Sequence, residues 1–371
     1  MSPARQPAAA PSEHRRPTLR DVARAAGVSQ STTSRALRSQ GYVAADVKER
    51  VHKAAAKLGY VPDVMARHLR QRVSHSIGVL VSDLRNAFYA DLAAGASRAA
   101  KKAGYSVMLI DDRLVAEEEL EASEAFASMR VAGVVMTPLT ARVSQYLLQQ
   151  RIPVVEVDRQ FATETCDAVV VDNRVASSKL TEHLLGLGHR RIALLVDELF
   201  WTTGRERVQG YELALLEAGV PLDPGLKMSV GGDVAAAQQA AMGLLLAADP
   251  PTAIFAANNV LAEGVWRAAA DLGLRLPEDL SIVSFDEAPW MTLVSPNVTT
   301  VRQDGVALGE AAVVRLLERI AAPSAPISTV VFRAEVAVRG SSGPAATTAA
   351  GGTRHYADHE GALLVRGSAT G

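Results

Sequence analysis

Short apolar runs alternate with helical segments from residue 77 to residue 338, and this alternation is the strongest constraint on the fold. We expect strands at 77–82, 106–111, 133–137, 153–158, 191–196, 253–257 and 281–285, with late strands near 327–338. We expect helices at 88–103, 114–130, 141–150, 173–187, 204–218, 233–247, 259–272 and 305–320. Strands this apolar are typical of parallel sheets that helices cover on both faces. There are too many units for one small sheet, so the pattern predicts an α/β core of two doubly wound parallel-sheet lobes.

Polar side chains stand where six of these strands end. In open parallel sheets, ligands bind at the carboxyl ends of the strands, so these residues mark the expected ligand cleft. They are Asp83, Asp111, Asp158, Asp197, Asn258 and Asp286.

A helix-turn-helix pattern precedes the core, at Thr18–Leu37. Thr18 is a suitable cap for a first helix, Gly27 interrupts the helical pattern, and Ser29 is a suitable cap for a second helix over about 30–37. In this motif the second helix lies in the DNA major groove. Its outward side chains can hydrogen-bond to bases or phosphates, and none is acidic: Gln30, Ser31, Thr32, Ser34 and Arg35. The alternative for an isolated motif of this length is a surface helix pair in another helical domain.

The charge distribution favours DNA binding over that alternative. The whole chain has a formal net charge of −1, but residues 15–72 hold thirteen Lys and Arg against four acids. That stretch therefore carries +9 and the remainder carries −10. A basic head on an acidic body indicates that the head meets a polyanion and the body does not.

A third helix is expected over Ala45–Leu58, ended by Gly59, which completes an all-α head. The segment Pro62–Leu69 has the start of a helix of only about two turns. A helix this short is unstable in water without a partner, so it should order only on docking; the alternative is a plain linker.

These patterns divide the chain into five expected parts. The division is a disordered extension at 1–17, the helix-turn-helix domain at 18–60, a short helix and linker at 61–75, the two-lobed domain at 76–341 and a disordered Gly/Ala/Thr-rich tail at 342–371.

Composition indicates a cytoplasmic protein. The chain is 48% hydrophobic, has no apolar run of transmembrane length and begins without the apolar centre of a signal peptide. Its one cysteine, Cys166, excludes an internal disulfide and a multi-cysteine metal site and is expected to fill space beside a strand. We expect no cofactor, no bound metal, no membrane partner and no catalytic residues.

The chain resembles the lactose-repressor/galactose-repressor family of transcription regulators over about residues 18–341. The resemblance rests on TLRDVARAAGVSQSTTSRAL, LGYVPDVMARHL, SIGVLVSDLRNAFYADL, IPVVEVDRQF, LGHRRIALL, RERVQGYELAL, FAANNVLAEGV, LRLPEDLSIVSFDEAPW, VTTVRQ and AEVAVRGSS, in this order. It implies a DNA-binding head, a hinge helix and a core like the periplasmic sugar-binding proteins. It also implies a homodimer or tetramer on a pseudopalindromic operator, with affinity tuned by a small molecule, and the absence of a terminal heptad repeat leaves no sign of a coiled-coil tetramer.

The resemblance assigns roles to residues of the head and hinge. Gln30 and Ser31 match the principal base-reading positions, and Thr32, Ser34 and Arg35 match positions that contact phosphates or bases. Leu69 matches the hinge leucine that wedges between base pairs from the minor groove, and Ala66 matches the small residue where paired hinge helices approach. Thr18, at the start of the first helix, completes the expected DNA-binding set.

In the core, the resemblance assigns ligand positions to aromatic and polar residues from both lobes. Phe88 and Tyr89 match stacking positions, and Arg207, Asn258, Asp286 and Gln303 match polar positions of the cleft. The strand-end Asp158 and the aromatic Trp201 complete the expected ligand set. This mixture suits a neutral, hydroxyl-rich effector, and we expect a mono- or oligosaccharide, with a nucleoside as the alternative.

The sequence departs from the usual family pattern at several positions. Thr33 replaces a usual Val in the head, Arg38 replaces a common Asn, and Asp63 replaces the Asn that opens the hinge helix. In the core, Ala87, Ala132 and Asn259 replace Pro, Asp and Asp respectively. Asn259 removes one charge at the rim of the cleft, which bears on the polarity of the ligand.

Two other classes of protein could use the same core. A secreted solute-binding protein should carry a signal peptide and lack the basic head, and this chain has the reverse. An α/β enzyme could use the cleft acids for acid–base chemistry, but the chain has no Gly-x-Ser-x-Gly, no P-loop and no Gly-x-Gly-x-x-Gly after its first strand. His189, just before a strand, is expected to be structural, and His183 a satisfied or solvated histidine.

Overall fold

The computed structural model describes residues 17–38, 42–60 and 74–345, which belong to two compact units divided between Val73 and Ser74. The hinge positions Ala66 and Leu69, the position Asp63 and most of both expected tails lie outside the described residues. Each unit is described separately.

The head is three helices around a small apolar core. They are α1 (Leu19–Ala26), α2 (Gln30–Arg38) and α3 (Ala45–Leu58). Val22, Ala36 and Val51 are buried at their junction. One face of each short helix is enough to form this core, because small and β-branched side chains let the helices approach closely.

Capping residues define where the head helices begin and end, as expected. Thr18 Oγ1 and the Asp21 carboxylate form a reciprocal capping box at the start of α1. Gly27 and Gly59 adopt the left-handed backbone conformation that ends α1 and α3. Ser29 Oγ accepts the N–H of Thr32 at 3.1 Å at the start of α2.

Thr33 is fully buried in the head, and its hydroxyl donates to the Ser29 carbonyl at 3.0 Å. The replacement of the usual Val therefore leaves no unsatisfied hydroxyl in the core.

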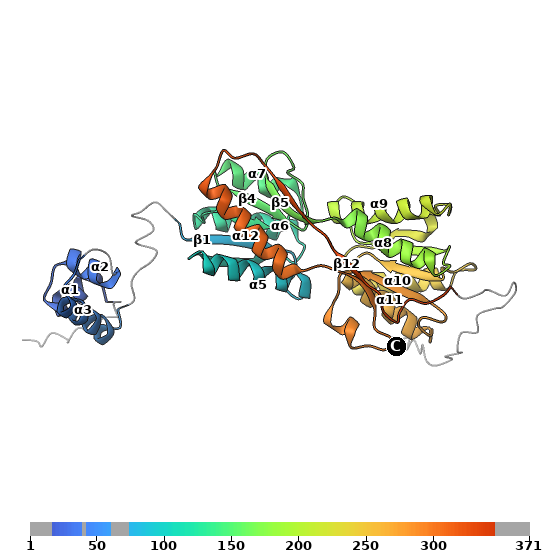
Figure 1. The fold of residues 1–371 in the computed structure, drawn as a ribbon, viewed down its shortest axis with the longest axis horizontal. Helices are drawn as coiled ribbons and strands as arrows, with labels where there is room; N and C mark the ends of the chain where they lie inside the picture. The colour runs from blue at the N-terminus through green and yellow to red at the C-terminus, as the bar shows by residue number, and fades with distance from the viewer. Residues whose placement is uncertain (1–16, 39–41, 61–73, 346–371) are drawn as a thin grey trace, which may run out of the picture. The chain divides into compact units, whose positions relative to one another are not determined.

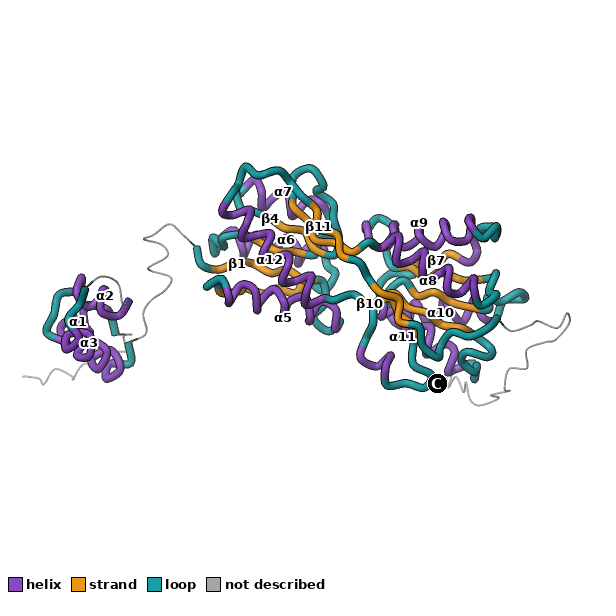
Figure 2. Tube along the Cα trace, in the orientation of Figure 1, coloured by secondary structure: helices purple, strands orange, loops and turns teal. Residues whose placement is uncertain are grey.

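The second unit contains two α/β lobes (Figures 1 and 2). The first lobe has the sheet order β11-β5-β4-β3-β1-β2, with all pairs parallel. Its elements are β1 (Ser76–Val81), α5 (Ala87–Lys102), β2 (Ser106–Asp111), α6 (Ala116–Ser128), β3 (Val134–Met136), α7 (Ala141–Gln149), β4 (Val154–Val157), β5 (Asp167–Val171), α12 (Gly305–Ala321) and β11 (Thr329–Phe332).

The second lobe has the sheet order β12-β10-β9-β8-β6-β7. All pairs are parallel except β10 with β12. Its elements are α8 (Asn173–Gly186), β6 (Ile192–Val196), α9 (Thr202–Glu217), η1 (Pro224–Leu226), β7 (Lys227–Ser229), α10 (Val234–Leu245), β8 (Ala253–Ala256), α11 (Asn259–Asp271), β9 (Ser281–Phe285), η2 (Pro289–Thr292), β10 (Thr299–Arg302) and β12 (Glu335–Ala337).

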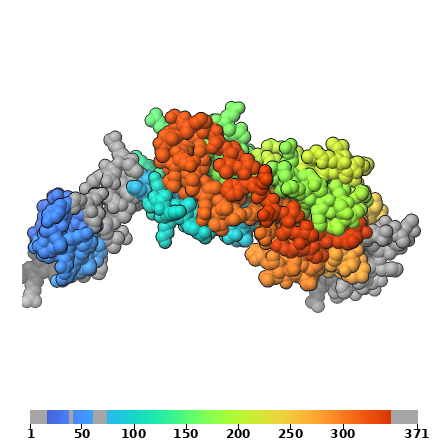
Figure 3. Space-filling view, viewed as in Figure 1, coloured from blue at the N-terminus to red at the C-terminus, as the bar shows by residue number. Residues whose placement is uncertain are grey.

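Both sheets therefore follow the same doubly wound order, and apolar clusters lie on both faces of each sheet, as the alternation predicts. The chain passes between the lobes three times: after β5, after β10 and between β11 and β12. Because of these crossings, α12 follows the second lobe in sequence but packs on α5 of the first lobe. Figure 3 shows the last part of the described chain, coloured orange to red, lying over both lobes.

Two glycines allow α5 and α12 to pack closely. A Cβ atom at Gly95 would lie 2.0 Å from the Val306 carbonyl oxygen, and one at Gly309 would lie 2.0 Å from the Leu92 carbonyl oxygen. A side chain at either position would force these helices apart.

The chain stays packed on the second lobe to Ala345, beyond the expected end of the body at 341. Ser341 Oγ donates to the Ile282 carbonyl at 2.6 Å, and the Ala345 N–H donates to the Leu187 carbonyl at 2.9 Å. His189, which is 1% exposed, lies 2.8 Å from Thr252 Oγ1 through Nδ1 and 3.0 Å from the Gly343 carbonyl through Nε2. His189 is thus structural, and burial lowers its pKa.

Candidate functional site

The carboxyl ends of the two sheets meet across the seam between the lobes. On the first-lobe side lie residues that follow β1, β2 and β4, and on the second-lobe side lie residues that follow β6, β8 and β9. Polar and stacking contacts between described residues join the sides, among them Asn86 to Asn259, the Gln160 N–H to Thr202 Oγ1 at 3.1 Å, and Arg159 over the ring of Trp201 at 3.7 Å.

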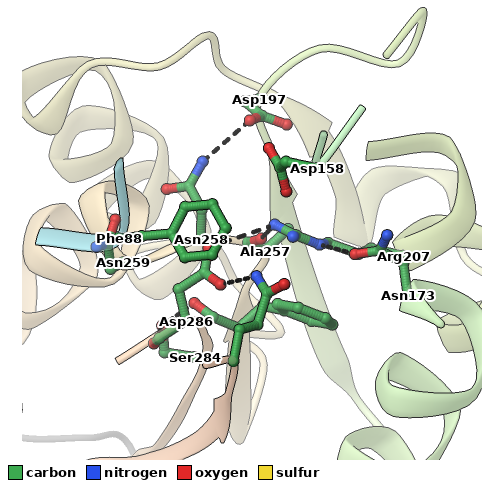
Figure 4. A network of polar contacts seen from close by, with 12 residues as sticks. Phe88, Asp158, Asn173, Asp197, Arg207, Ala257, Asn258, Asn259, Ser284 and Asp286 are labelled. Carbon is green, nitrogen blue, oxygen red and sulfur yellow. Dashed lines mark hydrogen bonds and ion pairs between the residues drawn. The ribbon is translucent and has the colours of Figure 1, made fainter. Parts of the chain in front are cut away.

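Arg207 organises the second-lobe half of the site (Figure 4). Its Nε donates to Asn173 Oδ1 at 3.0 Å and its Nη1 donates to the Ala257 carbonyl at 2.6 Å. The same Nη1 lies 3.7 Å from Asp286 Oδ2, and the guanidinium group stacks on Phe285. The arginine is therefore held in one orientation, which fixes the Asp286 carboxylate beside it.

Two amide side chains complete this half. Gln303 Nε2 donates to Asp286 Oδ1, and Asn258 Nδ2 donates to Asp197 Oδ2 at 3.1 Å. Asn258 also caps α11, because its Oδ1 accepts the N–H of Leu261 at 2.9 Å. The helix cap and the site thus depend on the same side chain.

The first-lobe half is built from Asp158, Tyr89 and Arg159. The Tyr89 hydroxyl donates to Asp158 Oδ2 at 3.3 Å and accepts from Arg159 Nη2 at 3.0 Å. Arg159 Nη1 also donates to Ser82 Oγ at 3.2 Å. Phe88 lies edge-on to Tyr89, with ring centroids 5.2 Å apart.

Burial controls the protonation of these groups. It raises the pKa of the Asp158 carboxyl to about 6, although Arg159 and Arg207 lower that pKa. Burial likewise raises the pKa of Asp286, against the lowering effect of Arg207. The pKa of the Tyr89 hydroxyl is raised far above its ordinary value, so this group remains a donor.

Asp158 and Asp286 also have unusual backbone conformations. Their φ angles are 68° and 65°, in the left-handed region that few non-glycine residues adopt. They follow β4 and β9, which occupy corresponding places in the two sheets. Strain of this kind at matched strand ends is typical of functional sites.

Four buried polar atoms of the site have no protein hydrogen-bond partner among the described residues. Two are donors, Arg159 Nε and Trp201 Nε1, and two are acceptors, Asp197 Oδ1 and Gln303 Oε1. Buried polar atoms are nearly always hydrogen-bonded, so these four atoms are available to a polar molecule between the lobes.

A cavity of about 230 Å³ adjoins the site at Asp158 and Asn173. Its other lining residues are Gln160, Phe161, Thr163, Val170, Thr202, Arg205 and Glu206. The volume is below the range of pockets for drug-sized molecules.

The structure brings expected ligand residues from both lobes to this seam. The Tyr89 hydroxyl is hydrogen-bonded to Asp158, and Tyr89 is 7% exposed. Trp201 is 6% exposed, and Arg159 covers one face of its ring. Phe88 is also 7% exposed, and its ring lies edge-on to that of Tyr89.

Sequence reasoning did not assign Arg159 or Asn173 to the site. Asp197 was expected at the cleft only as a strand-end residue, without a specific ligand role, and Arg159 follows the strand-end Asp158 directly. No local sequence pattern marks Asn173 as a site residue, because it belongs to the site only through its hydrogen bond with Arg207, which α9 brings next to it.

The expected DNA-contacting residues occupy one side of α2 in the head. Gln30, Ser31 and Arg35 are exposed, and Thr32 and Ser34 are half-buried. The first-helix residue Thr18 is half-buried and its hydroxyl is engaged in the capping box. No acidic residue lies on α2, so its exposed side suits a polyanion.

Within residues 17–38, 42–60 and 74–345, no three His, Cys, Asp or Glu side chains come together to hold a metal ion. No helix in these ranges is long and apolar enough to cross a bilayer. Cys166 is buried among apolar residues beside β5, and burial raises the pKa of its thiol to about 12.

Comparison with known families identifies both units. Residues 18–63 match the model of bacterial regulatory proteins of the lacI family, and residues 181–342 match a periplasmic binding protein-like domain. The chain is 30% identical to the ribose operon repressor of Escherichia coli (strain K12) over 310 residues, which cover 83% of this chain and 94% of that relative.

Solved structures agree with this similarity. The lac repressor dimer bound to operator and the anti-inducer ONPF shares 28% identity and a TM-score of 0.80, covering 89% of this chain and all of the other. A LacI family transcriptional regulator from Enterococcus faecium with bound ribose shares 27% identity and a TM-score of 0.65, covering 72% of this chain and 99% of the other.

Proposed function

Because this chain belongs to the lacI family of bacterial regulatory proteins, it is a DNA-binding transcription regulator with an effector-binding core, and we propose that it is a repressor controlled by a small sugar. Regulators of this family work in the cytoplasm, where the DNA is. The repressor would bind a pseudopalindromic operator as a homodimer, as in the lac repressor structure, so that each head reads one half-site.

The arrangement of donors and acceptors at the seam carries the sugar proposal. Asp158 faces the site from the first lobe, and Arg207 and Asp286 face it from the second. A carboxylate accepts from two hydroxyls, and the Nη2 group of Arg207, which does not hold Asn173 or the Ala257 carbonyl, can donate to a hydroxyl, so these residues match vicinal hydroxyls. Phe88 supplies an apolar surface suited to the C–H face of a sugar ring.

Charge and size favour a neutral monosaccharide. The carboxylates are accompanied by Arg159 and Arg207, so a strongly charged ligand would leave buried charge uncompensated. The adjoining cavity of about 230 Å³ is small for a second ring. Ribose is named for the Escherichia coli relative and bound in the Enterococcus structure, so D-ribose is the first probe.

We assign no catalytic role to the cleft acids. Asp158 accepts from Tyr89 and Asp286 accepts from Gln303, an arrangement that orients ligand hydroxyls. Turnover of any sugar held in the cleft would contradict this assignment.

The head residues have roles that follow from their exposure. We propose that Gln30 and Ser31 read base edges, and that Thr32, Ser34 and Arg35 contact phosphates or bases. Effector binding would then change operator affinity by shifting the lobes between two arrangements.

The test is a ligand screen on the full chain. Thermal-shift and calorimetric measurements would compare D-ribose with other monosaccharides, disaccharides and nucleosides, and each binder would be tested for its effect on DNA recovered by selection from a random library. A monosaccharide that binds and changes DNA affinity supports the proposal. Binding by nucleosides alone, or sugar binding without an effect on DNA, would overturn it.

A further inference from the structure

A pair of asparagines joins the two lobes directly beside the effector site. Asn86 Nδ2 donates to Asn259 Oδ1 at 3.1 Å, and Asn259 Nδ2 donates to Asn86 Oδ1 at 2.8 Å. The two residues are 173 positions apart in sequence. Asn86 precedes α5 of the first lobe, and Asn259 begins α11 of the second.

Each member of the pair is tied to a residue that faces the ligand. Asn86 caps α5, because its Oδ1 accepts the N–H of Phe88 at 3.1 Å. Asn259 follows Asn258, which donates to Asp197 at 3.1 Å. Figure 4 labels Phe88, Asn258 and Asn259 among the residues of this polar network. A change in the spacing of the pair therefore moves effector contacts from both lobes.

We propose that Asn86 and Asn259 are positioning residues that hold the lobes at the spacing in which the two halves of the effector site align. They thereby set effector affinity without themselves being required for operator binding. This proposal rests on the proposed effector site, but the lobe spacing can be measured without a ligand.

The reciprocal amide pair has a specific chemical requirement. Each side chain must donate and accept at once, which a carboxylate cannot do at neutral pH. Asn259 is 4% exposed, so a lost partner there is not fully replaced by water. Asn259 stands where the family usually has Asp. The replacement removes a charge from the rim of the cleft, and the amide makes two hydrogen bonds across the seam where a carboxylate could only accept one.

Three variants separate the two hydrogen bonds. Asn86→Asp keeps the helix cap and accepts from Asn259 but loses its donation. Asn259→Asp still accepts the hydrogen bond from Asn86 Nδ2 but can no longer donate one to Asn86 Oδ1. The double variant has two facing carboxylates and no donor. Asn297→Asp is the matched control, because Asn297 Nδ2 donates only within the second lobe, to the Thr292 and Val294 carbonyls.

Lobe spacing would be measured as a distance distribution between spin labels at Ser128→Cys, on the last residue of α6, and Glu217→Cys, on the last residue of α9. Both positions are exposed, whereas Cys166 is 1% exposed and protected from labelling. Dilution with unlabelled chain suppresses distances between subunits of a homodimer.

The expected result is a graded opening in the absence of ligand. Each single Asp variant should shift the ratio of close to distant lobes about fivefold, the typical effect of one neutral hydrogen bond. The double variant should shift that ratio by more than the product of the two single effects, because its carboxylates repel. With D-ribose, the concentration for half-maximal binding should rise about fivefold in each single variant.

A distance distribution in the double variant equal to that of Asn297→Asp would overturn the proposal. If the double variant does not fold, as judged by circular dichroism, Asn259→Ala provides the same test, because it removes both hydrogen bonds without adding charge. Lack of D-ribose binding by the unsubstituted chain would count against the sugar proposal and would leave the lobe-spacing result unaffected.

Discussion

At the scale of single residues, the cleft is a set of buried polar groups whose orientation the protein fixes before any ligand arrives. Arg207 is held by Asn173 and the Ala257 carbonyl, and it in turn lies beside Asp286. Such fixed groups discriminate between ligands because a mismatched ligand leaves a buried donor or acceptor unpaired. Specificity is therefore expected to depend on individual side chains of the cleft.

Asp286→Asn should shift the effector response to higher sugar concentrations and spare operator binding. Asparagine tolerates the left-handed backbone that this position requires, but it loses the charge opposite Arg207. Loss of a hydrogen bond to a charged group costs about 1.5–3 kcal/mol, which is roughly a 10- to 100-fold weaker effector affinity. The measurement is the affinity for selected DNA with and without the identified sugar.

Asp249→Asn, at an exposed position paired with Arg191, is the matched control for this substitution. An undiminished response in Asp286→Asn would remove Asp286 from the site. Loss of DNA binding without effector would show that Asp286 is structural.

Asp112 makes stability depend on pH. It is fully buried after β2, its Oδ1 accepts the Leu114 N–H at 3.0 Å, and its Oδ2 has no protein partner among the described residues. Burial and, to a smaller extent, the Glu119 carboxylate raise its pKa to about 7. Below that pH the folded chain holds a proton that the unfolded chain releases, so this group lowers stability as pH rises.

Asp112→Asn should therefore gain stability relative to the natural chain as pH rises from 6.5 to 8, by about 1 kcal/mol. The lowered pKa values of His183 and His189 act in the opposite direction but at lower pH. Thermal midpoints of both proteins at the two pH values give the difference. A constant difference would mean that Asp112 is not protonated in the folded chain.

At the scale of elements, α2 packs one side against the core of the head and leaves its other side exposed to solvent. Thr33 and Ala36 face the core, while Gln30, Ser31 and Arg35 remain on the opposite side. The Ser29 hydroxyl satisfies the first turn of the helix. The exposed side of α2 is thus held against the head core from its first turn, although the helix has only nine residues.

Gln30→Ala should relax base preference at one position in each half-site. A lost bidentate contact costs about 1–3 kcal/mol of discrimination at that base pair, with a smaller effect on binding to unrelated DNA. Competition binding on a panel of single-base operator variants measures the change. A uniform loss across the panel would reassign Gln30 to phosphate contact.

At the scale of the whole molecule, charge is divided between the parts of the chain. The stretch at 15–72 carries +9 and the remainder −10, so the acidic body is repelled by the DNA that attracts the head. Repulsion of this kind favours binding through the heads alone.

Operator binding should consequently depend steeply on salt. A regulator that neutralises about 6–10 phosphates loses roughly 10³- to 10⁵-fold in affinity between 50 and 200 mM salt. Titrations with a pseudopalindromic site at several salt concentrations give the slope, and a site with one half scrambled tests whether two heads are engaged. A nearly flat salt dependence, or equal affinity for both sites, would contradict binding by paired basic heads.

The sequence by itself determined the helix-turn-helix, the alternation of strands and helices, and the strand-end residues of the cleft. These follow from local patterns: caps such as Thr18 and Gly27, and apolar runs long enough to span a covered sheet. The short strands β5, β7 and β10 were not predicted, because their hydrogen-bond partners lie in distant segments and three to five residues carry little periodic signal.

Only the tertiary structure decided which residues meet across the seam. The chain crosses between lobes three times, which returns α12 to the first lobe and sets Asn86 against Asn259 over 173 positions. It also placed Arg159 on Trp201 and left Trp201 Nε1 without a protein partner among the described residues. Such contacts depend on how two packed lobes fit together, and no local pattern in the sequence encodes that fit.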